Sequence, residues 1–122
     1  MHLLIDLFRG SGPPRRYRVD VTDRNSGNGD DWSLSMTEAD TGRTITSAHR
    51  SAIMRRCTRR LLRLVPERCV ELELDDQVVR VSLEQGRICM QPPQPAPAQQ
   101  RALRLLTYRA VELEARKHRG AA

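Results

Sequence analysis

The chain has 122 residues, 39% of them hydrophobic, and a formal net charge of +6. This length suits one small domain with its own core, and no apolar run is long enough to cross a membrane. Because only 3% of the residues are aromatic, the core must be aliphatic, and a surface that stacks bases on aromatic rings is not expected. An early acidic residue, Asp6, argues against a signal peptide, so a cytoplasmic protein is predicted.

An antiparallel meander is predicted for residues 1–40. Its strands are expected at residues 2–8, 16–22 and 32–38. In the second strand, Tyr17, Val19 and Val21 alternate with charged residues, which is typical of a half-buried strand. GSGPP at residues 10–14 predicts a turn, and the polar residues 23–31 predict a loop.

The clearest helix is predicted for residues 47–65, with Ser47 as its N-cap and Pro66 after its end. At about 100° per residue, its apolar residues share one face that should pack against the sheet. They are Ile53, Met54, Cys57, Leu61, Leu64 and Val65. The opposite face carries five arginines, namely Arg55, Arg56, Arg59, Arg60 and Arg63.

After this helix, the pattern predicts a strand at residues 69–74 and leaves residues 75–86 open between two structures. The alternation around Val79 and Val81 favours a strand that follows an Asp-Asp turn. A short helix that ends at Gly86 is the alternative.

Residues 91–99 are rich in proline and are predicted to link a domain at residues 1–90 to a C-terminal helix at residues 100–122. The narrow apolar stripe of this helix consists of Leu103, Leu106, Ala110 and Leu113. Through it the chain could dock on a partner protein or form a homo-oligomer. No internal sequence repeat is visible.

Positive charge is concentrated on the first helix. Residues 41–66 hold seven Arg residues and no acid, so Arg55, Arg59 and Arg63 repel one another at i,i+4 spacing. A solvated face is the ordinary meaning of such a pattern. The functional meaning is an anionic partner: nucleic-acid phosphate, an acidic protein surface or acids of the same chain. Those acids are Glu67, Glu71 and Glu73. Arg accounts for 20 of the 21 basic residues, which suits bidentate phosphate contacts and is also typical of GC-rich coding.

The other polar residues predict no catalytic centre and no metal site. Cys57, Cys69 and Cys89 are widely spaced and form no zinc pattern with the histidines, so free thiols are expected. The serines belong to no recognisable Ser-His-Asp motif, and GSG is not followed by the residues of a phosphate loop. His49, at the start of the helix, is interpreted as a capping or surface residue.

The order of the predicted elements, together with several short motifs, resembles the ribonuclease H-like family over residues 2–88. LFRGSGPP at residues 7–14 is similar to the family's first strand and its Asp-Gly-Ser turn. ITSAHRSAIMRRCTRRLLRLVPERCVELELDDQVV at residues 45–79 is similar to its helix entry, long helix and following strand. The resemblance implies an α/β fold that combines a mixed sheet with the long helix. The sheet would consist of the meander and a further strand parallel to the first one. The C-terminal helix would follow this domain.

The resemblance also implies where the carboxylates around the family's two Mg²⁺ ions would lie, and most of them are replaced. Phe8 or Arg9 occupies the position at the end of the first strand, and the long helix contains no acid. Only Asp75 or Asp76 can supply the carboxylate that ends the fourth strand. Because one carboxylate does not hold two divalent ions, these aspartates would be a remnant metal position, with no catalytic residue and no cofactor.

Three functions remain as hypotheses. The first is a non-catalytic ribonuclease H-like module that binds nucleic acid, or a nucleic-acid-associated partner, through the five arginines. The second is a protein-interaction subunit of a bacterial mobile element or phage, which docks through its C-terminal helix. The third is a divergent Mg²⁺-dependent nuclease that uses Asp6, Asp75 and Asp76.

Overall fold

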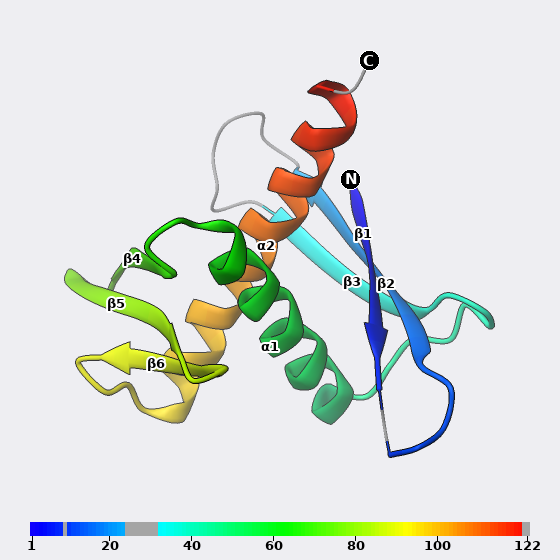
Figure 1. Cartoon of the computed structure of the whole chain (residues 1–122), viewed down its shortest axis with the longest axis horizontal. Coiled ribbons are helices and arrows are strands. Elements are labelled where there is room, and N and C mark those ends of the chain that lie inside the picture. The colour runs from blue at the N-terminus through cyan, green and yellow to red at the C-terminus, as the bar shows by residue number, and fades with distance from the viewer. Residues whose placement is uncertain (9, 24–31, 121–122) are drawn as a thin grey trace. The chain divides into compact units, whose positions relative to one another are not determined.

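The described part of the chain is mixed α/β, with two antiparallel three-stranded sheets and two helices (Figure 1). The computed structural model describes residues 1–8, 10–23 and 32–120. Its elements are β1 (His2–Leu7), β2 (Arg15–Asp23), β3 (Trp32–Glu38), α1 (Ser47–Leu64), β4 (Cys69–Leu74), β5 (Gln77–Glu84), β6 (Arg87–Gln91) and α2 (Ala96–Gly120). The predicted α/β class is confirmed, while Arg9 and residues 24–31 of the predicted loop lie outside the described residues.

The chain divides into two compact units, and each helix contributes residues to both. The first unit combines Met1–Ile53 with Val111–Ala122 and holds the sheet β1–β2–β3. The second unit, Met54–Ala110, holds the sheet β4–β5–β6. These boundaries differ from the predicted ones at residues 90 and 99.

The first sheet has one buried apolar face. Its strands pair in chain order, and the register aligns Leu3 with Val19 and Val19 with Met36. All three side chains are buried, which confirms the alternation predicted for the second strand. On the other face, Arg16 pairs with Asp6 at 2.9 Å, so charged side chains cover the exposed side of the sheet.

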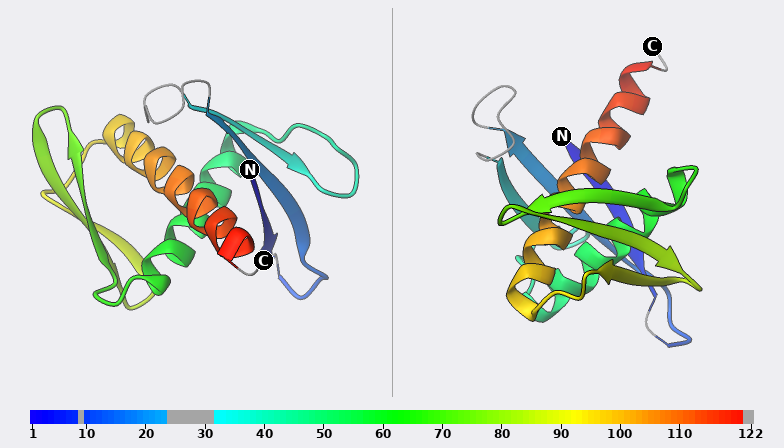
Figure 2. Two further views of the ribbon diagram at one scale, coloured as in Figure 1. Left: turned by 90° about the horizontal axis from the view of Figure 1, so that it is seen from above. Right: turned by 90° about the vertical axis from the view of Figure 1, so that its left-hand side faces the viewer.

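The second sheet is built in the same way within the second unit (Figure 2). Its register aligns Val70 with Val81 and Val81 with Met90. Residues 77–84 form its central strand, so the strand interpretation of residues 75–86 is confirmed and the short helix is wrong.

A tight hairpin joins β4 to β5. Asp75 and Asp76 form its two-residue turn, and both have positive φ, 49° and 61°. A type I′ turn, which continues the twist of the strands, requires positive φ at both central positions, and Asp tolerates this conformation better than most residues. The two aspartates are therefore explained by the local backbone.

The strand that the family resemblance placed beside β1 lies in the second sheet. β4 pairs antiparallel with β5, and among the described residues β1 pairs with β2 alone. Because a two-residue turn can join antiparallel strands, β5, which follows β4 in the chain, also lies beside β4 in the sheet. The mixed sheet of the ribonuclease H-like family is not found in the described residues.

The order strand–strand–strand–helix occurs twice along the chain, although the sequence shows no visible repeat. Buried positions also have the same spacing in the two helices. In α1 they are Ile53, Cys57, Thr58, Leu61 and Leu62. The corresponding residues of α2 are Ala102, Leu106, Thr107, Ala110 and Val111, and α2 buries Ala98, Leu103 and Tyr108 in addition.

The helix ends differ from their predicted positions by a few residues. Thr46, not Ser47, caps α1, because its hydroxyl oxygen accepts a hydrogen bond from the backbone N–H of His49 at 3.5 Å. Leu64, predicted to be buried, is 46% exposed. The second helix begins at Ala96, so the predicted proline-rich linker is shortened to the segment between β6 and α2. Within the described residues, neither helix is long and apolar enough to span a membrane.

Candidate functional site

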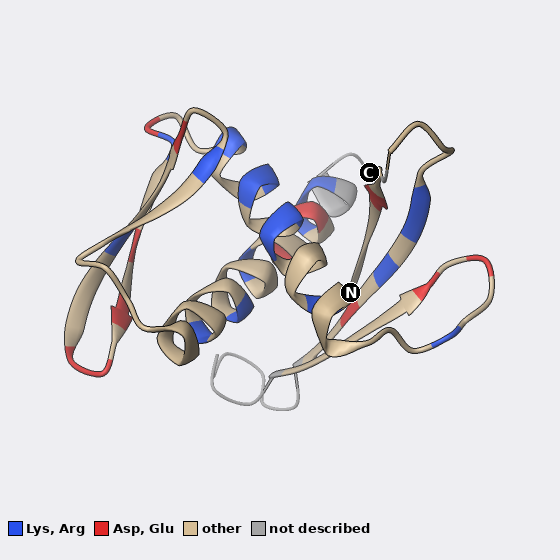
Figure 3. Cartoon of the chain, turned by 90° about the horizontal axis from the view of Figure 1, so that it is seen from below, with Lys and Arg blue, Asp and Glu red and all other residues tan. Residues whose placement is uncertain are grey.

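The five arginines that were predicted to share one face of α1 all lie in the second unit, on the part of the helix between Arg55 and Arg63, whereas Arg50 belongs to the first unit. We call this set, Arg55, Arg56, Arg59, Arg60 and Arg63, the arginine stripe. Figure 3 shows Lys and Arg in blue, and this colour recurs along α1. Arg63 is exposed and the other four are half-buried, so the stripe is accessible but not fully solvated.

Most of the stripe has no acidic partner. Among the described residues, Arg55, Arg59 and Arg63 take part in no salt bridge, and the same is true of Arg56. The acids that the sequence offered as neutralising groups, Glu67, Glu71 and Glu73, are exposed and are not paired with these four arginines. The stripe therefore presents positive charge that the described residues leave uncompensated.

The pKa of Arg59 reflects both its burial and the like charges around it. Burial lowers the pKa of Arg59, and the neighbouring charges of Arg55, Arg56 and Arg63 lower it further. Arg remains protonated even when its pKa falls, because its ordinary pKa exceeds about 12. An anion placed on the stripe would replace an unfavourable interaction with favourable charge-assisted hydrogen bonds.

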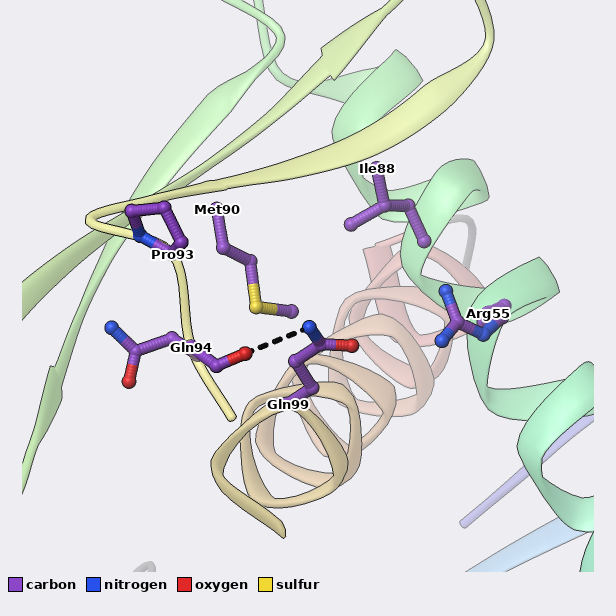
Figure 4. A pocket seen from close by; sticks show the side chains of 6 residues that line it. All are labelled: Arg55, Ile88, Met90, Pro93, Gln94 and Gln99. Carbon is purple, nitrogen blue, oxygen red and sulfur yellow. Dashed lines mark hydrogen bonds between the residues drawn. The ribbon is translucent and has the colours of Figure 1, made fainter. Parts of the chain in front are cut away.

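A small pocket lies beside the first arginine of the stripe. Its cavity volume is about 130 Å³, and all of its lining residues belong to the second unit. They are Arg55 from α1, Ile88 and Met90 from β6, Pro93 and Gln94 from the connection, and Gln99 from α2 (Figure 4). The pocket thus combines one cationic group and amide groups with apolar walls.

The pocket was not predicted from the sequence. Residues 91–99 were interpreted as a linker, so Gln94 and Gln99 gave no functional signal, and β6 was not expected. A segment that looks like a spacer is instead held by hydrogen bonds: Gln99 Nε2 donates to the Gln94 carbonyl oxygen at 2.9 Å. β6 has only five residues, and its three central residues are all half-buried, so it offers no alternating pattern.

The aspartates of the nuclease hypothesis have other partners. Asp6 accepts hydrogen bonds from Arg16, in the first unit. Asp75 accepts hydrogen bonds from Arg101, in the second unit, and these hold the pKa of Asp75 below its usual value. In the part of the chain that the structure describes, no three His, Cys, Asp or Glu residues gather into a set that could hold a metal ion.

A second cavity lies in the first unit and is electrostatically mixed. Its volume is about 230 Å³, and its lining residues are Arg15, Arg16, Glu38, Asp40, Thr41 and Arg43. Arg15 lies 3.5 Å from Glu38, and Arg16 is paired with Asp6, so the acids offset the arginines. The stripe and its pocket are the stronger candidate because their charge is not offset in this way.

In comparisons with protein-family models, with curated proteins and with solved structures, no significant match to the chain was found. The functional argument therefore depends on the geometry and charge of the stripe.

Proposed function

We propose that this protein is a non-catalytic module that binds nucleic acid through the arginine stripe. The observation that carries this function is the set of stripe arginines without an acidic partner among the described residues. A helix keeps such like charges together only at a cost, and a phosphate backbone would offset that cost. The planar fork of Arg also matches phosphate oxygens better than an ammonium group does.

The linear arrangement of the charges favours a polymer over a single anion. Arg55, Arg59 and Arg63 follow one another at four-residue steps, which correspond to about 6 Å along a helix. A chain of phosphates can contact such a row in succession. An acidic protein surface is the competing partner, and a binding assay can distinguish the two.

Binding through the stripe does not require the ribonuclease H-like fold, because the stripe lies within one helix. The protein-interaction hypothesis needs the apolar stripe of α2 to be accessible. Leu103, Leu106 and Ala110 of that stripe are buried, so this surface has little to offer a partner or a second copy. The nuclease hypothesis needs a carboxylate cluster, and two of its three aspartates, Asp6 and Asp75, are engaged by arginines.

Fluorescence anisotropy with labelled single-stranded DNA, duplex DNA, RNA and an RNA–DNA hybrid tests the proposal. The variant Arg55→Gln/Arg59→Gln/Arg63→Gln should weaken binding by at least about tenfold, since each hydrogen bond to a charged group contributes about 1.5–3 kcal/mol. A matched variant, Arg43→Gln/Arg80→Gln/Arg87→Gln, removes the same charge from exposed positions outside α1 and should retain most of the affinity.

No binding of the wild-type protein to any of the four nucleic acids at low salt would contradict the proposal. Tighter binding to polyglutamate than to all four nucleic acids would favour an acidic protein partner instead.

A further inference from the structure

The pocket beside Arg55 has the size of a fragment rather than of a whole small-molecule ligand. Its volume of about 130 Å³ is well below the roughly 300–1,000 Å³ of typical ligand sites. Its position matters because Arg55 both lines the pocket and begins the arginine stripe. A polymer that lies along the stripe therefore passes the mouth of the pocket.

Hydrogen bonds fix the polar groups of the pocket. The Gln94 side-chain amide donates to the Pro92 carbonyl at 2.8 Å, and Gln99 Nε2 donates to the Gln94 carbonyl at 2.9 Å. Because its nitrogen is held in this way, the carbonyl oxygen of Gln99 is directed toward the side of the pocket where Arg55 lies (Figure 4). A fixed hydrogen-bond acceptor thus faces a guanidinium donor.

The other walls are apolar and suit a flat ring. Ile88 and Met90, both half-buried in β6, lie on one side of the pocket with Pro93. The thioether of Met makes favourable contacts with aromatic rings. These groups take the place of the aromatic residues that base-binding surfaces ordinarily use, which are scarce in this chain.

We infer that the pocket binds one unpaired nucleobase of a strand whose phosphates lie along the arginine stripe; this assignment rests on the proposed function. The exposed edge of an unpaired base carries hydrogen-bond donors and acceptors. Arg55 would donate to an acceptor of that edge, and the Gln99 carbonyl oxygen would accept from a donor. In a duplex the same edge is occupied by the opposite strand, so the protein prefers single-stranded nucleic acid.

Binding of two labelled single strands of equal length, one with bases and one entirely abasic, measures the base contact separately from the phosphate contacts. The full chain should bind the base-bearing strand about fivefold or more tightly, which is the lower end of the effect of one base contact. The variant Gln99→Leu should lose this preference while it keeps affinity for the abasic strand. Gln77→Leu, at an exposed position of β5, is the matched control and should behave as wild type.

A second variant, in α1, tests the pocket independently of any folding defect that Gln99→Leu causes in α2. Arg55→Lys keeps the positive charge for phosphates but lacks the planar fork, so it should lose the base preference and retain the salt dependence. Equal binding of both strands by the wild-type protein, or an unchanged preference in both variants, would overturn the assignment of the pocket alone. Failure of the wild type to bind either strand at low salt would overturn the proposed function and the pocket together.

Discussion

Arg101 and Arg104 of α2 carry the same charge as the stripe arginines of α1 but have different surroundings. In α2, Arg101 is paired with Asp75. Arg104 donates a hydrogen bond to the Tyr108 hydroxyl at 3.0 Å, and its guanidinium carbon lies 5.7 Å from the centre of that ring. These arginines are part of the folded structure, because each has a partner on a neighbouring turn or element.

In α1, by contrast, Arg55, Arg59 and Arg63 have no such partner among the described residues. The two helices otherwise correspond, since each follows a three-stranded meander and buries residues at the same spacing. The comparison shows that composition alone does not identify a binding surface. What distinguishes α1 is that Arg55, Arg59 and Arg63 are paired with no acid in the described part of the chain.

The largest predicted effect tests whether the two helices are equally important to the core. Leu62 in α1 and Leu106 in α2 are both fully buried, so Leu62→Ala and Leu106→Ala should each lower the free energy of unfolding by about 2–5 kcal/mol. Urea unfolding followed by circular dichroism measures this, with the exposed Leu64→Ala as control. A negligible effect of Leu106→Ala would mean that α2 is an appendage, as the predicted linker suggested.

Thr58 in α1 and Thr107 in α2 occupy corresponding positions. Their substitutions should change the stability by less than the leucine variants do, and in opposite directions. Thr107 Oγ1 donates to the Leu103 carbonyl at 2.7 Å, whereas the buried Thr58 Oγ1 has no hydrogen-bond partner among the described residues. Thr107→Val should destabilise the protein by about 1 kcal/mol, and Thr58→Val should stabilise it by about 1 kcal/mol, because it removes a buried hydroxyl that lacks a partner. Thermal unfolding would contradict this interpretation if both variants shifted the midpoint in the same direction.

The smallest effect concerns the ion pair that anchors α2 to the β4–β5 turn. Since Arg101 lowers the pKa of Asp75, the pair stabilises the fold above the unfolded-state pKa, and this contribution is lost as the pH falls through the lower folded-state pKa. Asp75→Asn should therefore destabilise slightly near neutral pH and have no effect in strong acid. Solvent and salt screen the exposed pair, so differences in melting temperature at low ionic strength are the suitable measurement. Equal destabilisation by Asp75→Asn at both pH values would contradict this account.

Local structure was well predicted where a periodic pattern was long. The alternation of Tyr17, Val19 and Val21 and the spacing of Ile53 and Cys57 specify a strand and a helix, because side-chain direction follows the backbone period. β6 was missed because a strand of five residues beside a proline-rich segment offers too few positions for a pattern. The predicted linker at residues 91–99 overlaps the start of α2 at Ala96, because Pro97 lies in the first helical turn, where proline is tolerated.

The sequence patterns could not predict which strands pair or which residues meet in the pocket. The periodicity of β4 is equally compatible with a place beside β1 or beside β5, and only the tight turn at Asp75 and Asp76 decides between them. The stripe itself was visible in the sequence. The unpaired state of Arg55, Arg59 and Arg63 among the described residues, and the convergence of Gln99 with Arg55, depend on tertiary structure.

The most direct test of the central claim is the salt dependence of binding to a single strand. The logarithm of the binding constant should fall with the logarithm of the salt concentration, with a slope of about 0.7 per neutralised phosphate. Replacing Arg55, Arg59 and Arg63 by Gln should reduce the magnitude of this slope by about 2, since three contacts are lost. Replacing Arg101, Arg104 and Arg116 by Gln should leave the slope unchanged. An equal reduction in both variants, or none in the first, would contradict the assignment of nucleic-acid binding to α1.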